Sequence, residues 1–90
     1  MAKTIWKFPL EITDEQSVEM PKGAQLLSVA MQGGSDCCLW ALVDPSDIRE
    51  SRKVNIYGTG HPLPDDPGRH IGTFVMHDGL LVFHAFDPTR

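Results

Sequence analysis

One glycine-rich segment of this chain carries residue types that suit the binding of a small anionic ligand. It reads Tyr57-Gly58-Thr59-Gly60-His61-Pro62, and the same irregular stretch closes with Arg69-His70. Glycines let a ligand approach the backbone closely and leave N–H groups that suit phosphate or carboxylate oxygens. We therefore expect a ligand-binding site built from Tyr57, Gly58, Thr59, Gly60, His61, Arg69 and His70.

In this hypothesis each type of residue has its own role. The amides of Gly58 and Gly60 and the guanidinium of Arg69 hold phosphate groups. Tyr57 stacks on a base or a sugar, and the threonine and histidine of the segment orient the ligand. The alternative is a structural turn, because Gly-x-Gly alone is weakly specific. No helix is expected after the segment, as a dinucleotide fingerprint requires, and the Gly-Lys-[Ser/Thr] end of a P-loop is missing.

The four histidines do not predict a metal site. Their intervals of nine, seven and seven residues match no common zinc-ligand spacing. The four are His61, His70, His77 and His84. We expect surface histidines together with histidines that are hydrogen-bonded near strand ends. His84 lies between two phenylalanines, Phe83 and Phe86, so we expect it to be partly buried. No metal and no cofactor is predicted.

The arrangement of nucleophiles and carboxylates does not indicate catalysis. Asp65 and Asp66 adjoin in a proline-rich stretch, and adjacent carboxylates there are typical of a solvated turn. No Gly-x-Ser-x-Gly elbow or Cys/His signature is present. We therefore expect a protein that is not an enzyme. The alternative is a small hydrolase or lyase that uses His61 or His70 with an aspartate.

The two cysteines, Cys37 and Cys38, are adjacent in the sequence. Neighbouring side chains of a strand point to opposite faces, so a bond between these two would need unusual geometry. The Cys-x-x-Cys spacing of redox pairs is absent. We expect two reduced thiols, one packed and one nearer the surface, as is usual in a cytosolic protein.

The elements that must position these residues are short strands. Alternating or continuous apolar runs separated by turn signals predict six or seven strands and no helix of note. A single helical turn is allowed after Asp44, which could cap it. The expected strands cover residues 6–12, 16–20, 25–32, 37–43, 53–58, 70–76 and 80–86.

Four local patterns predict where individual strands lie in the sheets and which side chains share a face. Pro9 cannot donate a ladder hydrogen bond, so the first strand lies at an edge or a bulge. Residues 37–43 are apolar at every position, which predicts a central strand covered on both faces. Asp78-Gly79 between two apolar runs predicts a hairpin. In the strand 25–32, alternation places Leu27, Val29 and Met31 on one face, and Leu26, Ser28 and Ala30 on the other.

The composition agrees with a small β domain. Hydrophobic residues make up 41% of the 90 residues and charged residues 22%, which excludes a disordered chain and a fibrous protein. Seven prolines and eight glycines favour many turns. We therefore predict an all-β protein, one domain over residues 1–90, folded as a small antiparallel β-sandwich or a closed barrel.

Charge and hydropathy limit the partners. A net charge of −4 disfavours DNA and RNA as partners, since it repels phosphate backbones. No signal-peptide pattern and no apolar run of membrane-spanning length is present, so we expect a cytoplasmic protein without a membrane partner. Trp40 shares a face with Cys38 and Leu42, and an exposed apolar face of this kind predicts a homo-oligomer.

Five blocks of the sequence resemble a family of small proteins carried by tailed phages and by prophage-bearing bacteria. The resemblance spans most of the chain, and the blocks occur in the family's order. They are Ile5-Trp6-Lys7-Phe8-Pro9-Leu10, Glu19-Met20-Pro21-Lys22-Gly23-Ala24, Cys38-Leu39-Trp40-Ala41-Leu42-Val43-Asp44, Tyr57-Gly58-Thr59-Gly60-His61-Pro62 and Ile71-Gly72-Thr73-Phe74. The resemblance transfers no active-site residue. It implies a compact accessory protein that acts in the cytoplasm of an infected bacterium.

These observations lead to a functional expectation. Several unrelated groups of small phage proteins act as sponges that bind a nucleotide immune signal. The comparison with them is an analogy of biological context and rests on no shared motif. We expect a non-catalytic, homo-oligomeric protein that binds a nucleotide-type ligand between subunits, because one thin core cannot enclose a nucleotide. The alternative is a protein-interaction module, either an inhibitor of a host factor or a minor structural component of a phage particle.

Overall fold

The computed structural model describes residues 2–33, 36–76 and 79–89, and these form seven antiparallel strands. No helix is found within those ranges. The strands are β1 (Thr4–Leu10), β2 (Glu15–Pro21), β3 (Gln25–Gln32), β4 (Asp36–Val43), β5 (Arg49–Gly58), β6 (Arg69–Met76) and β7 (Leu81–Asp87). The prediction of an all-β protein is confirmed. The helical turn allowed after Asp44 is instead a turn in which Asp47 N donates to Asp44 O.

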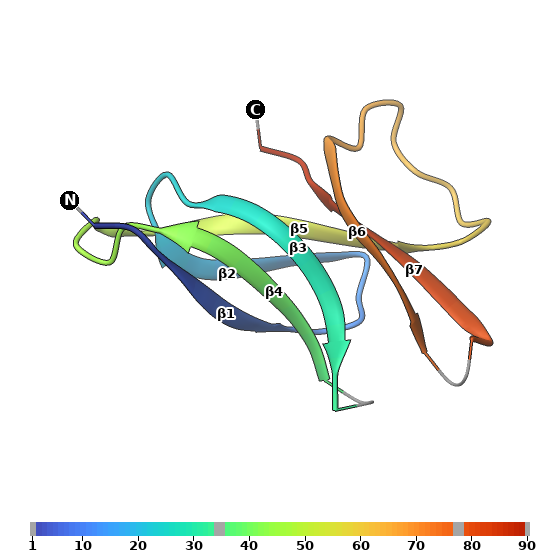
Figure 1. The fold of residues 1–90 in the computed structure, drawn as a ribbon. Coiled ribbons are helices and arrows are strands. Elements are labelled where there is room, and N and C mark those ends of the chain that lie inside the picture. The colour runs from blue at the N-terminus through green and yellow to red at the C-terminus, as the bar shows by residue number, and fades with distance from the viewer. Residues whose placement is uncertain (1, 34–35, 77–78, 90) are drawn as a thin grey trace.

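The strands form two sheets that lie face to face (Figure 1). One has the order β1-β4-β3, and the other has the order β2-β5-β7-β6. Of the two predicted architectures, this is the sandwich. β4 is the central strand of its sheet, and β1, which contains Pro9, is an edge strand, so both predictions are confirmed. The antiparallel pairing of β6 with β7 confirms the hairpin, although His77 and Asp78 of its turn lie outside the described residues.

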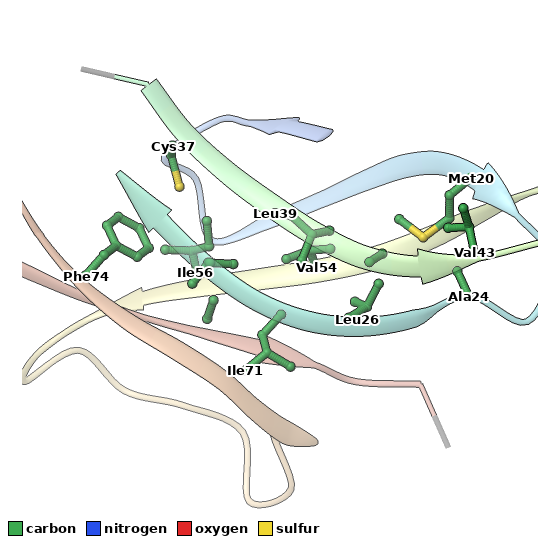
Figure 2. Packing of buried hydrophobic residues seen from close by; sticks show 13 residues of the cluster. Met20, Ala24, Leu26, Cys37, Leu39, Val43, Val54, Ile56, Ile71 and Phe74 are labelled. Carbon is green, nitrogen blue, oxygen red and sulfur yellow. The ribbon is translucent and has the colours of Figure 1, made fainter. Parts of the chain in front are cut away.

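The core lies between the two sheets and is lined by both (Figure 2). Leu39 and Val43 come from one sheet, and Val54 and Ile56 face them from the other. Both cysteines are buried, so the prediction that one thiol lies nearer the surface is wrong. The reason is that Cys37 faces the core, while Cys38, on the outer face where Trp40 and Leu42 are only half-buried, is shielded locally by Gln32.

A bulge in β3 changes which residues face the core. Leu26 pairs with Ala41 and Ser28 pairs with Trp40, so Leu27 is an extra residue without its own partner position. A bulge of this kind shifts the alternation by one residue. Leu26 and Val29 are therefore both buried, and the prediction that Leu26 lies on the face opposite Val29 is wrong.

A second bulge lies in β6 and matters for the candidate site. His70 pairs with Phe86 and Gly72 pairs with Ala85, so Ile71 is the extra residue. Ile71 is buried in the core, and Gly72 also faces the core side, where β6 approaches β3. A Cβ atom on Gly72 would lie 2.7 Å from Val29 Cγ2. Glycine at this position therefore permits the close approach of the two sheets.

Candidate functional site

Two histidines and two threonines form a continuous hydrogen-bonded row on the outer face of the four-stranded sheet. His70 Nε2 lies 2.9 Å from Thr73 Oγ1, and Thr73 Oγ1 lies 3.1 Å from His84 Nδ1. His84 Nε2 lies 2.7 Å from Thr59 Oγ1. We call these four residues the histidine–threonine chain. His70, Thr73 and Thr59 are exposed, and His84 is half-buried, as its sequence neighbours predicted.

Strand pairing explains why the four side chains meet. Thr73 on β6 is directly opposite His84 on β7, which in turn is opposite Tyr57 on β5. Thr59 follows β5 and is held against β7, because its amide donates to the carbonyl of Val82 at 3.1 Å. The bulge at Ile71 then places His70 on the same face as Thr73.

The hydrogen bonds of the histidine–threonine chain can all be satisfied in one direction. A neutral imidazole carries one N–H and one acceptor nitrogen, and a hydroxyl both donates and accepts. His70 can donate to Thr73, Thr73 to His84, and His84 to Thr59. The hydroxyl of Thr59 then donates to the carbonyl of Val82 at 3.4 Å. The chain thus begins at an exposed imidazole and ends at a backbone carbonyl.

Tyr57 lies beside this chain but does not offer a stacking surface. Its ring packs against Phe86 with 6.1 Å between centroids, and Phe86 in turn contacts the edge of His70 at 5.4 Å. Only 8% of Tyr57 is exposed. The expectation that Tyr57 stacks on a ligand base is therefore corrected, because the ring is used in packing within the fold.

The glycine-rich segment forms a tight turn. Its Thr59 amide donates to Val82 O and its His61 amide donates to Gly58 O, each at 3.1 Å. Gly60 has a φ of 88°, a conformation that favours glycine. The His61 ring lies against Gly58, where an added Cβ would be 3.1 Å from its Cε1 atom. The amides of Thr59 and His61 therefore serve the turn, whereas the Gly58 and Gly60 amides, which were expected to hold phosphate, take no part in these two hydrogen bonds.

Arg69 and His70 are separated although they are adjacent in the sequence. Consecutive residues of a strand point to opposite faces. The Arg69 guanidinium donates to the carbonyl of Leu26 on β3 and lies 3.9 Å from Asp87 Oδ2. The structure therefore does not bring Arg69 together with the histidine–threonine chain, and its expected role as the phosphate contact of that site is corrected.

Two hollows flank Tyr57 and Thr59. The larger, about 550 Å³, is lined by Thr13, Asp14, Glu15, Tyr57 and Pro64. The smaller, about 250 Å³, is lined by Gly58, Thr59, His61, Leu80, Leu81, Val82 and Phe83. The two carboxylates of the larger hollow disfavour an anion there. The smaller hollow adjoins the histidine–threonine chain, because Thr59 belongs to both.

Sequence reasoning missed two members of this site. His84 was singled out for its burial but not as a site residue, and Thr73 gave no signal at all. The signal for His84 was a polar residue within an apolar strand. Thr73 could not be grouped with His70, because regular alternation places residues three apart on opposite faces of a strand.

Other site types find no support in the part of the chain that the structure describes. Among residues 2–33, 36–76 and 79–89, no three His, Cys, Asp or Glu side chains lie close enough together to hold a metal ion. No helix in those ranges could cross a membrane.

The fold and the site define a small all-β protein with two face-to-face sheets and the histidine–threonine chain on one outer face. The protein belongs to the family described as domain of unknown function (DUF7352), which matches residues 1–90. No curated protein and no solved structure matches it.

Proposed function

We propose that this protein binds a small anionic ligand of the nucleotide type at the histidine–threonine chain and does not alter it chemically. One observation carries the proposal: Thr59 and His70, from the two ends of the irregular stretch, are joined through Thr73 and His84. Two of the seven residues that were expected to contact the ligand thus lie in one connected row, together with two residues that were not expected there.

The chemistry of the row suits an oxyanion. In the neutral row every N–H and hydroxyl proton already donates within the row or to the carbonyl of Val82, so an anion would take one of these donors from its present acceptor. A donor bonds more strongly to a charged acceptor than to a neutral one, which favours this exchange. His70 and Thr73 are exposed and therefore reachable from solvent.

The proposed biological role is sequestration. The resemblance to phage-borne proteins supports a sponge that lowers the free concentration of a nucleotide immune signal in the cytoplasm of an infected bacterium. The proposal includes a homo-oligomer formed through the outer face of the β1-β4-β3 sheet, so the histidine–threonine chain on the other sheet lies away from this interface and not between subunits as expected from the sequence. Trp40 lies on that face with Lys7 and Ser28 as its paired neighbours, and it is only half-buried within one chain.

Native mass spectrometry with added cyclic nucleotides tests the binding proposal. We expect adducts at a fixed ratio per oligomer that are released intact on denaturation. Thr73→Val removes the central hydroxyl while keeping the side-chain shape, and we expect it to weaken binding about tenfold. Thr4→Val, on the exposed start of β1, is the matched control and should bind like the wild type. Absence of every adduct, or equal binding by Thr73→Val, would refute the proposal.

A second function is favoured by the exposed apolar residues near the β6–β7 hairpin. Leu80 is 83% exposed and Val75 is 54% exposed. Exposed apolar groups that lie close together are typical of protein-interaction surfaces. If no nucleotide binds, a stable complex with a host or phage protein that is lost in Leu80→Ser would support the interaction-module alternative.

A further inference from the structure

We infer that the hollow of about 250 Å³ beside Thr59 receives an uncharged aromatic ring of the ligand, while the histidine–threonine chain holds its anionic group. This inference rests on the proposed function and specifies its ligand. The ligand class is then an aromatic ring joined to an anionic group by a short linker, as in a nucleoside monophosphate.

The size of the hollow suits one part of a ligand rather than a whole ligand. Sites that enclose a whole drug-sized molecule measure about 300–1,000 Å³. A hollow of about 250 Å³ is smaller, so it encloses part of a ligand and leaves the remainder outside. Thr59 lines the hollow and contacts His84, so the remainder lies next to the chain.

The lining of the hollow suits a ring rather than a charged group. Four of its seven lining residues are apolar, namely Leu80, which precedes β7, and Leu81, Val82 and Phe83, which begin it. The imidazole of His61, placed against Gly58, adds a flat surface. No Asp or Glu is among the described residues that line it. Apolar walls with few polar groups are typical of sites for ring-containing ligands.

The hydroxyl of Thr59 and two backbone carbonyls of the hollow are already in use. The carbonyl of Val82 accepts from the Thr59 amide and hydroxyl, and the carbonyl of Gly58 accepts from the His61 amide. Besides the His61 imidazole, few side-chain groups of the hollow remain to form hydrogen bonds with the edge of a base. We therefore expect a preference for a ring over no ring, with little discrimination between purine and pyrimidine.

The experiment is a titration followed by backbone amide NMR with three probes: inorganic phosphate, adenosine and adenosine 5′-monophosphate. We expect the monophosphate to bind about tenfold more tightly than phosphate, through burial of the ring. It should shift the amides of residues 58–61 and 81–83, whereas phosphate should shift those of His70 and Thr73. Uridine 5′-monophosphate should bind within a few-fold of the adenine compound.

Two variants separate the ring site from the anion site. Leu81→Ser changes an exposed wall of the hollow, and we expect it to remove the advantage of the monophosphate while phosphate still binds. Val75→Ser, also exposed on β6 but outside the lining, is the matched control and should keep that advantage.

The outcomes distinguish the two proposals. Equal affinities for phosphate and the monophosphate, or an unchanged advantage in Leu81→Ser, would overturn the ring site and leave anion binding intact. Binding of adenosine as tight as that of the monophosphate would overturn the role of the histidine–threonine chain. Failure of every probe to bind would overturn the proposed function itself.

Discussion

His70 and Thr73 are three residues apart in one strand, and yet their side chains are hydrogen-bonded on the same face at 2.9 Å. Regular alternation would place them on opposite faces. The extra residue Ile71 removes this conflict, because it turns into the core together with Gly72 and leaves His70 and Thr73 outside. A single bulge thus creates one half of the candidate site.

Gly72→Ala should destabilise the fold and disturb this bulge. The new methyl would lie 2.7 Å from Val29 Cγ2 and 3.2 Å from Val29 N, so the sheets must separate. We expect a loss of about 1–3 kcal/mol in the free energy of unfolding, measured by urea denaturation. Val29→Ala removes the closest atom, so the double variant should lose less than the sum of the single losses. Strict additivity would contradict this account.

Asp87→Ala should be among the most damaging single changes. Asp87 Oδ2 accepts from Arg52 at 3.1 Å, and both side chains are buried. Removal of the carboxylate leaves the buried Arg52 guanidinium with only Glu50, at 4.0 Å, as its ion partner, and the loss of a buried partner costs up to about 3–5 kcal/mol. Asp47→Ala, in the exposed turn after β4, should change stability by less than about 0.5 kcal/mol. A loss below about 1 kcal/mol in Asp87→Ala would show that the pair contributes little.

The Cys37 thiol should remain protonated and unreactive in the native protein. Burial, reinforced by the neighbouring Cys38, raises the pKa of Cys37 from its ordinary 9.0 to about 11. Because the folded pKa is raised, the stability contribution is complete below pH 9 and is lost as the pH rises through 11. We expect the unfolding free energy to fall by about 2 kcal/mol more over this window than in Cys37→Ala. Rapid alkylation of native Cys37 at pH 8 would contradict this expectation.

Arg49 and Trp6 should stabilise the contact between the two sheets. The guanidinium carbon of Arg49, on β5, lies 5.1 Å from the ring centre of Trp6, on β1. A double-mutant cycle with Arg49→Gln and Trp6→Leu should give a coupling energy of about 0.5–1 kcal/mol, the range of exposed cation–π contacts. Arg49→Lys keeps the charge and should retain part of the coupling. A coupling of zero would show that the two residues act independently.

Much of the fold could be predicted from local patterns. The alternation of Trp6, Phe8 and Leu10, the uninterrupted apolar run of β4, and the prolines and glycines of the turns are properties of neighbouring residues. Each local pattern has one favourable outcome, because a strand with an apolar face must bury it and a proline cannot donate within a ladder. For this reason the strands, the edge position of β1 and the central position of β4 were foreseen.

The candidate site was foreseen only in part. The irregular stretch that contains Thr59 and ends at His70 was visible as a cluster of glycines and prolines. The burial of Tyr57 against Phe86 was not visible, because it depends on which strand pairs with β5. The partner of the Arg69 guanidinium was not visible either, because the carbonyl of Leu26 belongs to the opposite sheet.

The sequence alone determined which segments become strands, where they turn and which residue types lie near the irregular stretch. Only the tertiary structure decided that His70 shares a face with Thr73 and that Thr73 and His84 join Thr59. The physical reason is the spacing of the strand repeat. Successive side chains of a strand point to alternate faces, so one bulge moves every later residue of that strand to the opposite face. Bulges arise from packing between sheets rather than from local propensity.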